Sequence, residues 1–152
     1  MLSVDLSGQD LSEDLLAPAN AVISLLNQEP PDWLPEGNLN VRFVDDVTIR
    51  ELNKKYSGQD KATDVLSFSY IEDGHMSGEE LGDIAISLET AERQAAEASN
   101  QLADEIALLL LHGILHIAGI DHAQPDEQAV MDRLQAEILG AVNVKYRDFK
   151  WA

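Results

Sequence analysis

Apolar residues recur along this chain at two spacings, one typical of strands and one typical of helices. Residues 2–6 alternate apolar and polar side chains, which predicts a strand with one buried face. Apolar positions three and four residues apart between 11 and 28 predict a helix, in which Pro18 either starts the main part or introduces a kink. The same spacings predict strands at 40–45, 65–70 and 81–87, and helices from Asp45 or Asp46 to Tyr56 and at 88–98, 102–118 and 125–139, the last ended by Gly140.

The helix predicted over residues 102–118 is apolar on nearly every side between Ile106 and Leu111, which is typical of a buried helix. We therefore expect an α+β fold: a small mixed β-sheet of three or four strands packed with about five helices. The buried helix would be central, as in zinc hydrolases. A chain of 152 residues without a repeat or linker predicts a single domain over residues 1–152.

Composition excludes several classes of protein. The chain has no cysteine, so disulfides and thiolate metal ligands are absent. No apolar run reaches the ~18 residues that span a bilayer. The first residues lack the basic and apolar regions of a signal peptide, so we expect a cytoplasmic protein without membrane contact.

The chain is strongly acidic, with 28 acidic and 10 basic residues and a formal net charge of −18. At long range such a field repels nucleic acid. A bound dication and a local basic patch can still dominate one cleft. Lys54, Lys55 and Lys61 fall within eight residues and form either such a patch or a solvated helix end.

Three of the four histidines lie between positions 112 and 122. His112 and His116 are four residues apart, about 40° of rotation and ~6 Å of rise on a helix, so both rings leave the same face. Gly119 can end the helix in a left-handed conformation, and the chain can then return His122 to the same point. Three imidazoles with an open fourth position are typical of catalytic zinc, so we expect one Zn²⁺ per chain.

Two other interpretations of these histidines remain open. Histidines at this spacing also occur by coincidence, with one ring exposed and the other bonded to the backbone. The spacing equals that of metzincin peptidases, whose general-base Glu directly follows the first His. In this chain that position is Gly113, so the predicted metal ligands are present and the peptidase base is absent.

The stretch from His112 to His122, which reads H-G-x-L-H-x-x-G-x-D-H, resembles the signature of the YbeY family of bacterial rRNA maturation endoribonucleases. Other stretches match that family in the same order: V-D-D leading into I-x-x-L-N at 44–53, T-D-V-L-S-F at 63–68, and L-G-D-I-A-I at 81–86. The resemblance covers roughly residues 39 to 139.

This resemblance implies a metal-dependent endoribonuclease specific for single-stranded RNA. It also implies roles in 16S rRNA 3′-end maturation and ribosome quality control, with rRNA and the ribosomal subunit as partners. His112, His116 and His122 match the metal ligands of the family motif. Asp121 and Asp83 are candidate acceptors for the ring N–H of a ligand, a role that fixes the orientation of an imidazole.

The chain departs from the family pattern after Tyr56, where Ser57 takes the place of an Arg that is a candidate for holding RNA phosphate. Lys55 or Lys61 would then position the substrate, or the activity would be weaker. No general base is evident, so the catalytic residues stay unassigned.

Two reactions fit the predicted site: attack by a zinc-bound hydroxide on phosphorus, or metal-assisted attack by the ribose 2′-OH. The competing functions are a ribosome-associated factor whose metal is mainly structural, with weak or no cleavage, and a metallopeptidase-like hydrolase.

Overall fold

The computed structural model describes residues 1–70, 80–120 and 124–147. One mixed sheet has the strand order β1-β2-β4-β3, in which β1, β2 and β4 are parallel and β3 is antiparallel to β4. The strands are β1 (Leu2–Gly8), β2 (Gly37–Val44), β3 (Val65–Ser69) and β4 (Glu80–Ser87). The predicted small mixed sheet is confirmed.

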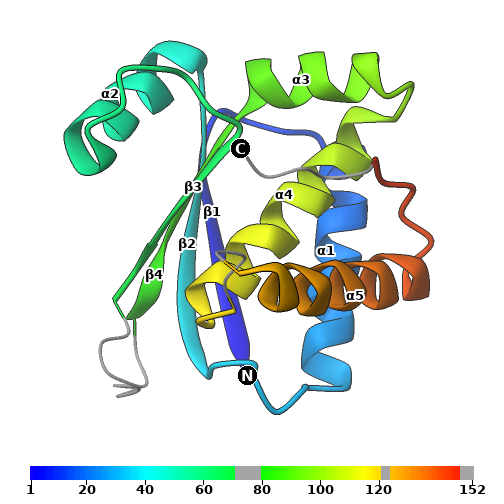
Figure 1. Cartoon of the computed structure of the whole chain (residues 1–152). Coiled ribbons are helices and arrows are strands. Elements are labelled where there is room, and N and C mark those ends of the chain that lie inside the picture. The colour runs from blue at the N-terminus through cyan, green and yellow to red at the C-terminus, as the bar shows by residue number, and fades with distance from the viewer. Residues whose placement is uncertain (71–79, 121–123, 148–152) are drawn as a thin grey trace.

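Five helices occur in the described part of the chain: α1 (Glu13–Gln28), α2 (Asp46–Ser57), α3 (Leu88–Glu97), α4 (Leu102–Ile117) and α5 (Pro125–Ala141). In Figure 1, α1, α4 and α5 lie on one side of the sheet, while α2 lies on the other side near one end of the strands. The face covered by α4 is called the inner face below, and the opposite face the outer face. The predicted α+β class is confirmed.

Short polar side chains start three of the helices. Ser12, Asp45 and Ser87 each accept a hydrogen bond from the backbone N–H three residues later, which satisfies a donor that the first helical turn leaves free. Of the two predicted caps for α2, Asp45 is therefore the one used. Pro18 does not start the first helix, because α1 begins five residues earlier and continues through it.

Two predicted boundaries differ from the structure. Gly140 does not end α5, which continues to Ala141 and terminates where Asn143 adopts the left-handed φ of 59°. The Val144 N–H then donates to the Leu139 carbonyl at 2.9 Å, a helix end that asparagine tolerates. β2 begins at Gly37, three residues before the predicted start, because its pairing with β1 extends to Leu2.

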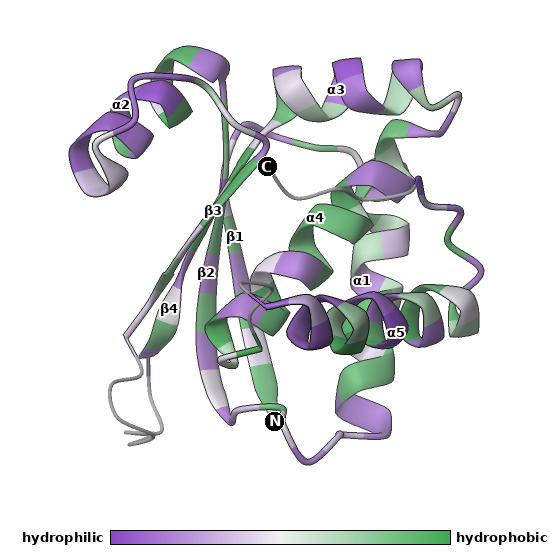
Figure 2. Cartoon of the chain, viewed as in Figure 1, coloured by the Kyte–Doolittle hydropathy of each residue, from purple (hydrophilic) through white to green (hydrophobic). Residues whose placement is uncertain are grey.

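Helix α4 forms the centre of the hydrophobic core. Every residue from Ile106 to Leu111 is at most 1% exposed, since α4 packs against β3 and β4 as well as against α1, α3 and α5. Figure 2 shows α4 as mostly hydrophobic, whereas α5 alternates between hydrophilic and hydrophobic residues. No described helix is both long enough and apolar enough to cross a membrane.

At Gly113 helix α4 approaches the sheet closely. A Cβ atom at this position would lie 2.7 Å from Cδ1 of Ile84 and 3.1 Å from both its Cγ atoms. Nearby, a Cβ at Gly82 would lie 2.7 Å from the Ile117 side chain of α4. The residue that replaces the peptidase Glu therefore faces the core of the sheet, where the missing side chain lets helix and strand meet.

We expect Gly113→Ala to lower the free energy of unfolding by about 1–3 kcal/mol, because the new methyl group must displace the Ile84 side chain in a close-packed core. Urea unfolding followed by circular dichroism measures this change. Gly140→Ala is the matched control: its Cβ meets nothing within 4 Å, and alanine favours helix, so that variant should gain about 0.5–1 kcal/mol. A Gly113→Ala variant as stable as the wild type would contradict the tight contact.

Candidate functional site

His112 and His116 lie side by side on α4, as their spacing predicts. Their ring centroids are 5.7 Å apart with an angle of 73° between the ring planes. Two imidazoles bound tetrahedrally to one zinc at ~2.0–2.1 Å per bond have centroids about 5 Å apart, so this pair fits a shared metal with little adjustment. His112 is only 3% exposed, which holds its ring in one orientation.

The chain after the histidine pair turns as predicted. Gly119 has a left-handed φ of 90°, and its N–H donates to the His116 carbonyl at 3.0 Å. The Ile120 N–H donates to the Leu115 carbonyl at 3.0 Å, which completes a Schellman-type helix end. The third predicted ligand, His122, and the neighbouring Asp121 lie outside the described residues. Within the described ranges no group of three metal-binding side chains occurs, so the three-histidine site stays a prediction.

The structure does not bring Asp83 to the histidines. Its neighbour Ile84 contacts Gly113 on the inner face, and successive side chains of a strand point to opposite faces. On the outer face, Asp83 accepts hydrogen bonds from the Asn40 amide at 3.2 Å and from the Tyr70 hydroxyl. The Asp83 carboxylate raises the pKa of the Tyr70 phenol to about 12, so that hydroxyl stays protonated.

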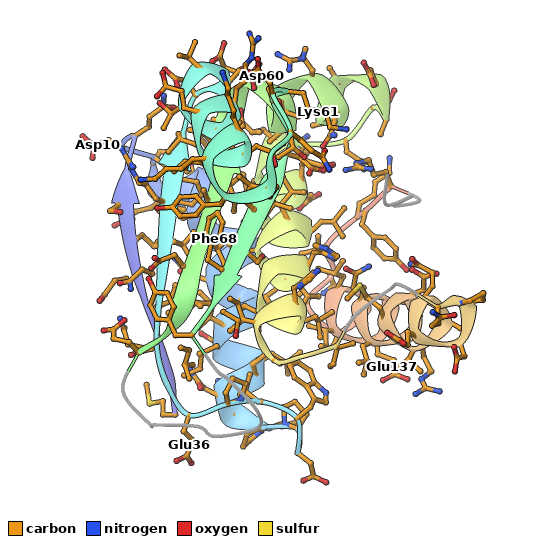
Figure 3. The ribbon with its side chains drawn as sticks, turned by 60° about the vertical axis from the view of Figure 1, so that its left-hand side comes forward. Asp10, Glu36, Asp60, Lys61, Phe68 and Glu137 are labelled. Carbon is orange, nitrogen blue, oxygen red and sulfur yellow. The ribbon has the colours of Figure 1, made fainter. Side chains whose placement is uncertain are left out.

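The predicted substrate-binding residues gather at the end of α2. Ser57 is the last helical residue and is exposed, and the Lys55 ammonium lies 5.1 Å from the Tyr56 ring centroid. Gly58 ends the helix in the left-handed conformation. Figure 3 labels Lys61 in the loop that follows, where its carbonyl accepts a 3.0 Å hydrogen bond from the buried Asn53 amide.

A cavity of about 460 Å³ opens beside α2 on the outer face of the sheet. Residues that line it include Asn40, Arg42, Tyr56, Phe68, Tyr70 and Asp83. Of this cavity, the sequence predicted only Asp83 and the end of α2 as functional. Two alternating patterns in the sequence could have indicated the cavity. Polar side chains occur at positions 38, 40 and 42, and aromatic side chains at positions 68 and 70.

Comparison with known proteins identifies the family. The family model described as Endoribonuclease YbeY matches residues 7–143 of this chain. The chain belongs to the YbeY family. The membership predicted from the histidine signature is therefore confirmed, over a longer part of the chain than the motifs covered.

Relatives and a solved structure agree with YbeY membership. A protein from Agrobacterium fabrum named Endoribonuclease YbeY is 38% identical over 151 residues, which cover 94% of this chain and 90% of the relative. One of the same name from Pelotomaculum thermopropionicum is 44% identical over 113 residues, or 72% of this chain and 74% of that relative. The solution structure of TM1509 from Thermotoga maritima has a TM-score of 0.61 at 26% identity, covering 94% of this chain and 92% of that one.

A largely buried ion pair joins Arg147, which lies beyond the stretch matched by the YbeY model, to Glu105 within that stretch. Arg147 donates from Nε to both carboxylate oxygens of Glu105, at 2.8 and 3.1 Å, and from Nη2 to the Gln94 side chain at 3.0 Å. The Asp64 carboxylate lies 3.7 Å from the same guanidinium. Glu105 belongs to the first turn of α4, so this pair ties the end of the chain to the helix that carries the histidines.

Burial raises the pKa of the Glu105 carboxyl above its usual 4.5, and the Arg147 guanidinium opposes that rise. When a carboxyl has a higher pKa in the folded state, that state binds more protons above pH 4.5, so stability falls as pH rises through this window. Loss of Arg147 leaves the Glu105 charge uncompensated and raises its pKa further.

We therefore expect Arg147→Met to cost about 3–5 kcal/mol of unfolding free energy at pH 8, and less at pH 5, where Glu105 can take up a proton. Urea unfolding at both pH values measures the difference. Arg50→Met is the control, because the Arg50–Asp60 pair is exposed and its loss should leave stability nearly unchanged at either pH. An equal cost for Arg147→Met at pH 5 and pH 8 would contradict the electrostatic role of Glu105.

Proposed function

We propose that this protein is a zinc-dependent endoribonuclease that cleaves single-stranded RNA, with one zinc ion per chain held by His112, His116 and His122. The observation that carries the proposal is the histidine pair, whose ring centroids lie 5.7 Å apart on a buried helix. A ligand pair on a core helix is pre-organised, as a precise metal site requires. The YbeY relatives add the reaction class, because they are named endoribonucleases.

We propose the ribosome as the place of this activity. The substrate would be rRNA on the ribosomal subunit, in the cytoplasm, and the roles would be 16S rRNA 3′-end maturation and ribosome quality control. Support comes from the YbeY match over residues 7–143. A chain with net charge −18 gains little long-range attraction for RNA, so recognition would depend on cations close to the bound strand.

The chain's own residues would divide the work of RNA cleavage. Bound zinc supplies positive charge for the phosphoryl oxygens and lowers the pKa of a coordinated water. His112 and His116 would hold the metal from the helix, while Lys55 and Lys61 would bind phosphate. Gly113 has no group to act as a base and faces Ile84 in the core. That contact opposes the peptidase interpretation, because a glutamate at this position would face the core.

His116→Ala should abolish retention of zinc on gel filtration, lower the melting temperature of the metal-loaded protein relative to wild type, and remove cleavage of single-stranded RNA. Atomic absorption, thermal denaturation and a gel assay with labelled RNA measure these changes. His75→Ala, which removes the histidine outside the cluster, is the matched control and should behave as wild type.

Two outcomes of that experiment would contradict the proposal. One equivalent of zinc retained by His116→Ala would show that the ligand assignment is wrong. Wild-type protein that binds zinc but does not cleave RNA, with or without chelator, would favour a structural metal in a ribosome-associated factor.

Ser57→Arg should raise kcat/KM for single-stranded RNA about tenfold or more at low salt, because a charge-assisted hydrogen bond to phosphate contributes about 1.5–3 kcal/mol. Ser57→Gln supplies similar length without charge and should leave kcat/KM near the wild-type value. Lys61→Ala should lower kcat/KM if Lys61 now holds the phosphate. Equal kcat/KM in all three variants would place the phosphate elsewhere.

A further inference from the structure

The cavity on the outer face has aromatic walls. Tyr56 of α2 and Phe68 of β3 have ring centroids 5.0 Å apart with their planes tilted by 57°, and Tyr70 follows Phe68 by two residues. Tyr56 and Tyr70 are 58% and 50% exposed, so broad ring surface faces solvent. Exposed aromatic rings beside a sheet are the usual surface on which unpaired bases stack. A volume of about 460 Å³ is within the range of small-molecule sites.

The polar part of the cavity carries hydrogen-bonding groups of fixed orientation. Within the described residues, each oxygen of the Asp83 carboxylate accepts one hydrogen bond, from Asn40 and from Tyr70 respectively, and a carboxylate oxygen can accept a second one. The Asn40 amide is itself held by the Glu80 carboxylate at 2.9 Å. A ligand that offers N–H donors beside an aromatic surface fits this arrangement. The amino groups of nucleobases have that geometry, and carboxylates accept from them.

Two cations lie at or beside the cavity: Arg42 lines it, and Lys55 lies next to the lining residue Tyr56. Arg42 is exposed and, within the described ranges, makes no ion pair, while the Lys55 ammonium lies over the Tyr56 ring. Five of the ten basic residues of the chain fall between positions 42 and 61. The same span has four acidic residues, so its formal net charge is +1 (five minus four), whereas the whole chain carries −18; the span is therefore better suited to a phosphate group than the rest of the chain.

We propose that this cavity binds one unpaired nucleotide of the RNA substrate. The base stacks on Tyr56 beside Phe68, its amino group donates to Asp83, and its phosphate lies near Arg42 and Lys55. An RNA strand bound here reaches the histidines around the edge of the sheet: β3 is an edge strand, and its Ser69 hydroxyl donates to the Ile117 carbonyl of α4 at 3.4 Å. The inference rests on RNA being the substrate, and it assigns a second contact on the face away from the metal.

The Asp83 acceptor gives this contact a preference among bases. Adenine and cytosine carry an exocyclic amino group that can donate to a carboxylate, whereas uracil presents carbonyl oxygens on the corresponding edge. Oligoadenylate and oligocytidylate should therefore bind about three- to tenfold more tightly than oligouridylate. Asp83→Asn replaces one acceptor oxygen by a donor, so this ratio should fall toward one.

Fluorescence anisotropy with labelled ten-nucleotide RNAs tests the proposal, at several salt concentrations and with RNA integrity checked on a gel. Tyr56→Ala should weaken binding about five- to a hundredfold, and Tyr56→Trp should retain it, because only the second keeps a stacking ring. Arg42→Gln should reduce the slope of log Kd against log salt by about 0.7, the value for one phosphate contact on a single strand.

Tyr146→Ala and Arg133→Gln are matched controls, since both residues are exposed and neither lines the cavity. Unchanged binding in Tyr56→Ala and an unchanged salt slope in Arg42→Gln would overturn the nucleotide site and leave the cavity to another partner, such as a protein. Cleavage is measured on the same samples. If RNA binding depends on Tyr56 but the protein does not cleave RNA, this inference stands and the nuclease proposal is wrong. If the protein cleaves RNA but the Tyr56 and Arg42 variants bind it as the wild type does, the nuclease proposal stands and this inference is wrong.

Discussion

The close contact between α4 and β4 holds the helix that carries the histidine pair against the sheet. Gly113 has no side chain, and Ile84 occupies the space that a Cβ would take. This contact allows the helix to lie directly on the sheet and bury residues 106–111 completely. A helix held in this way keeps His112 and His116 at a fixed separation, because its backbone has little freedom to move in a close-packed core. The missing side chain at Gly113 thus contributes to the rigidity of the candidate metal centre.

The sheet separates the histidine pair from the cavity that contains Asp83. The inner face carries the histidine pair on α4, and the outer face carries an aromatic and polar cavity with Asp83 in it. Ser69 and Tyr70, adjacent in sequence at the end of β3, belong to opposite sides: Ser69 contacts the carbonyl of Ile117, and Tyr70 lines the cavity. A single-stranded nucleic acid is flexible enough to follow such an edge, whereas a duplex is not. This arrangement suits the single-strand specificity that we propose.

Local patterns predicted most of the elements, because helix periodicity and strand alternation are properties of neighbouring residues. The histidine spacing and the left-handed Gly119 were predictable for the same reason. The long-range pairing of strands was not predictable from local patterns. β2 extends to Gly37 because β1 pairs with it there, and the orientation of Asp83 follows from its register with Asn40 and Phe68. In sequence, Asp83 follows Gly82 and precedes the apolar run from Ile84 to Ile86, so nothing local assigns it to the face away from the histidines.

The cavity escaped sequence analysis for a related reason. It combines residues from all four strands and from α2, and each of these segments contributes at most three residues to it. Taken by itself, Arg42 looks like a solvent-exposed residue of a strand. Tyr56, taken by itself, looks like a surface aromatic residue. Only the strand order β2-β4-β3 places them around one space.

Reconstitution of activity with metal tests the central claim most directly. Chelator-stripped protein is titrated with zinc, and cleavage of a 5′-labelled single-stranded RNA is followed at each step. If the histidines bind the catalytic metal, cleavage should be absent at the start and should rise linearly to a break at one equivalent of zinc per chain. Cleavage at full rate in the stripped protein, or none at any zinc concentration, would contradict the account.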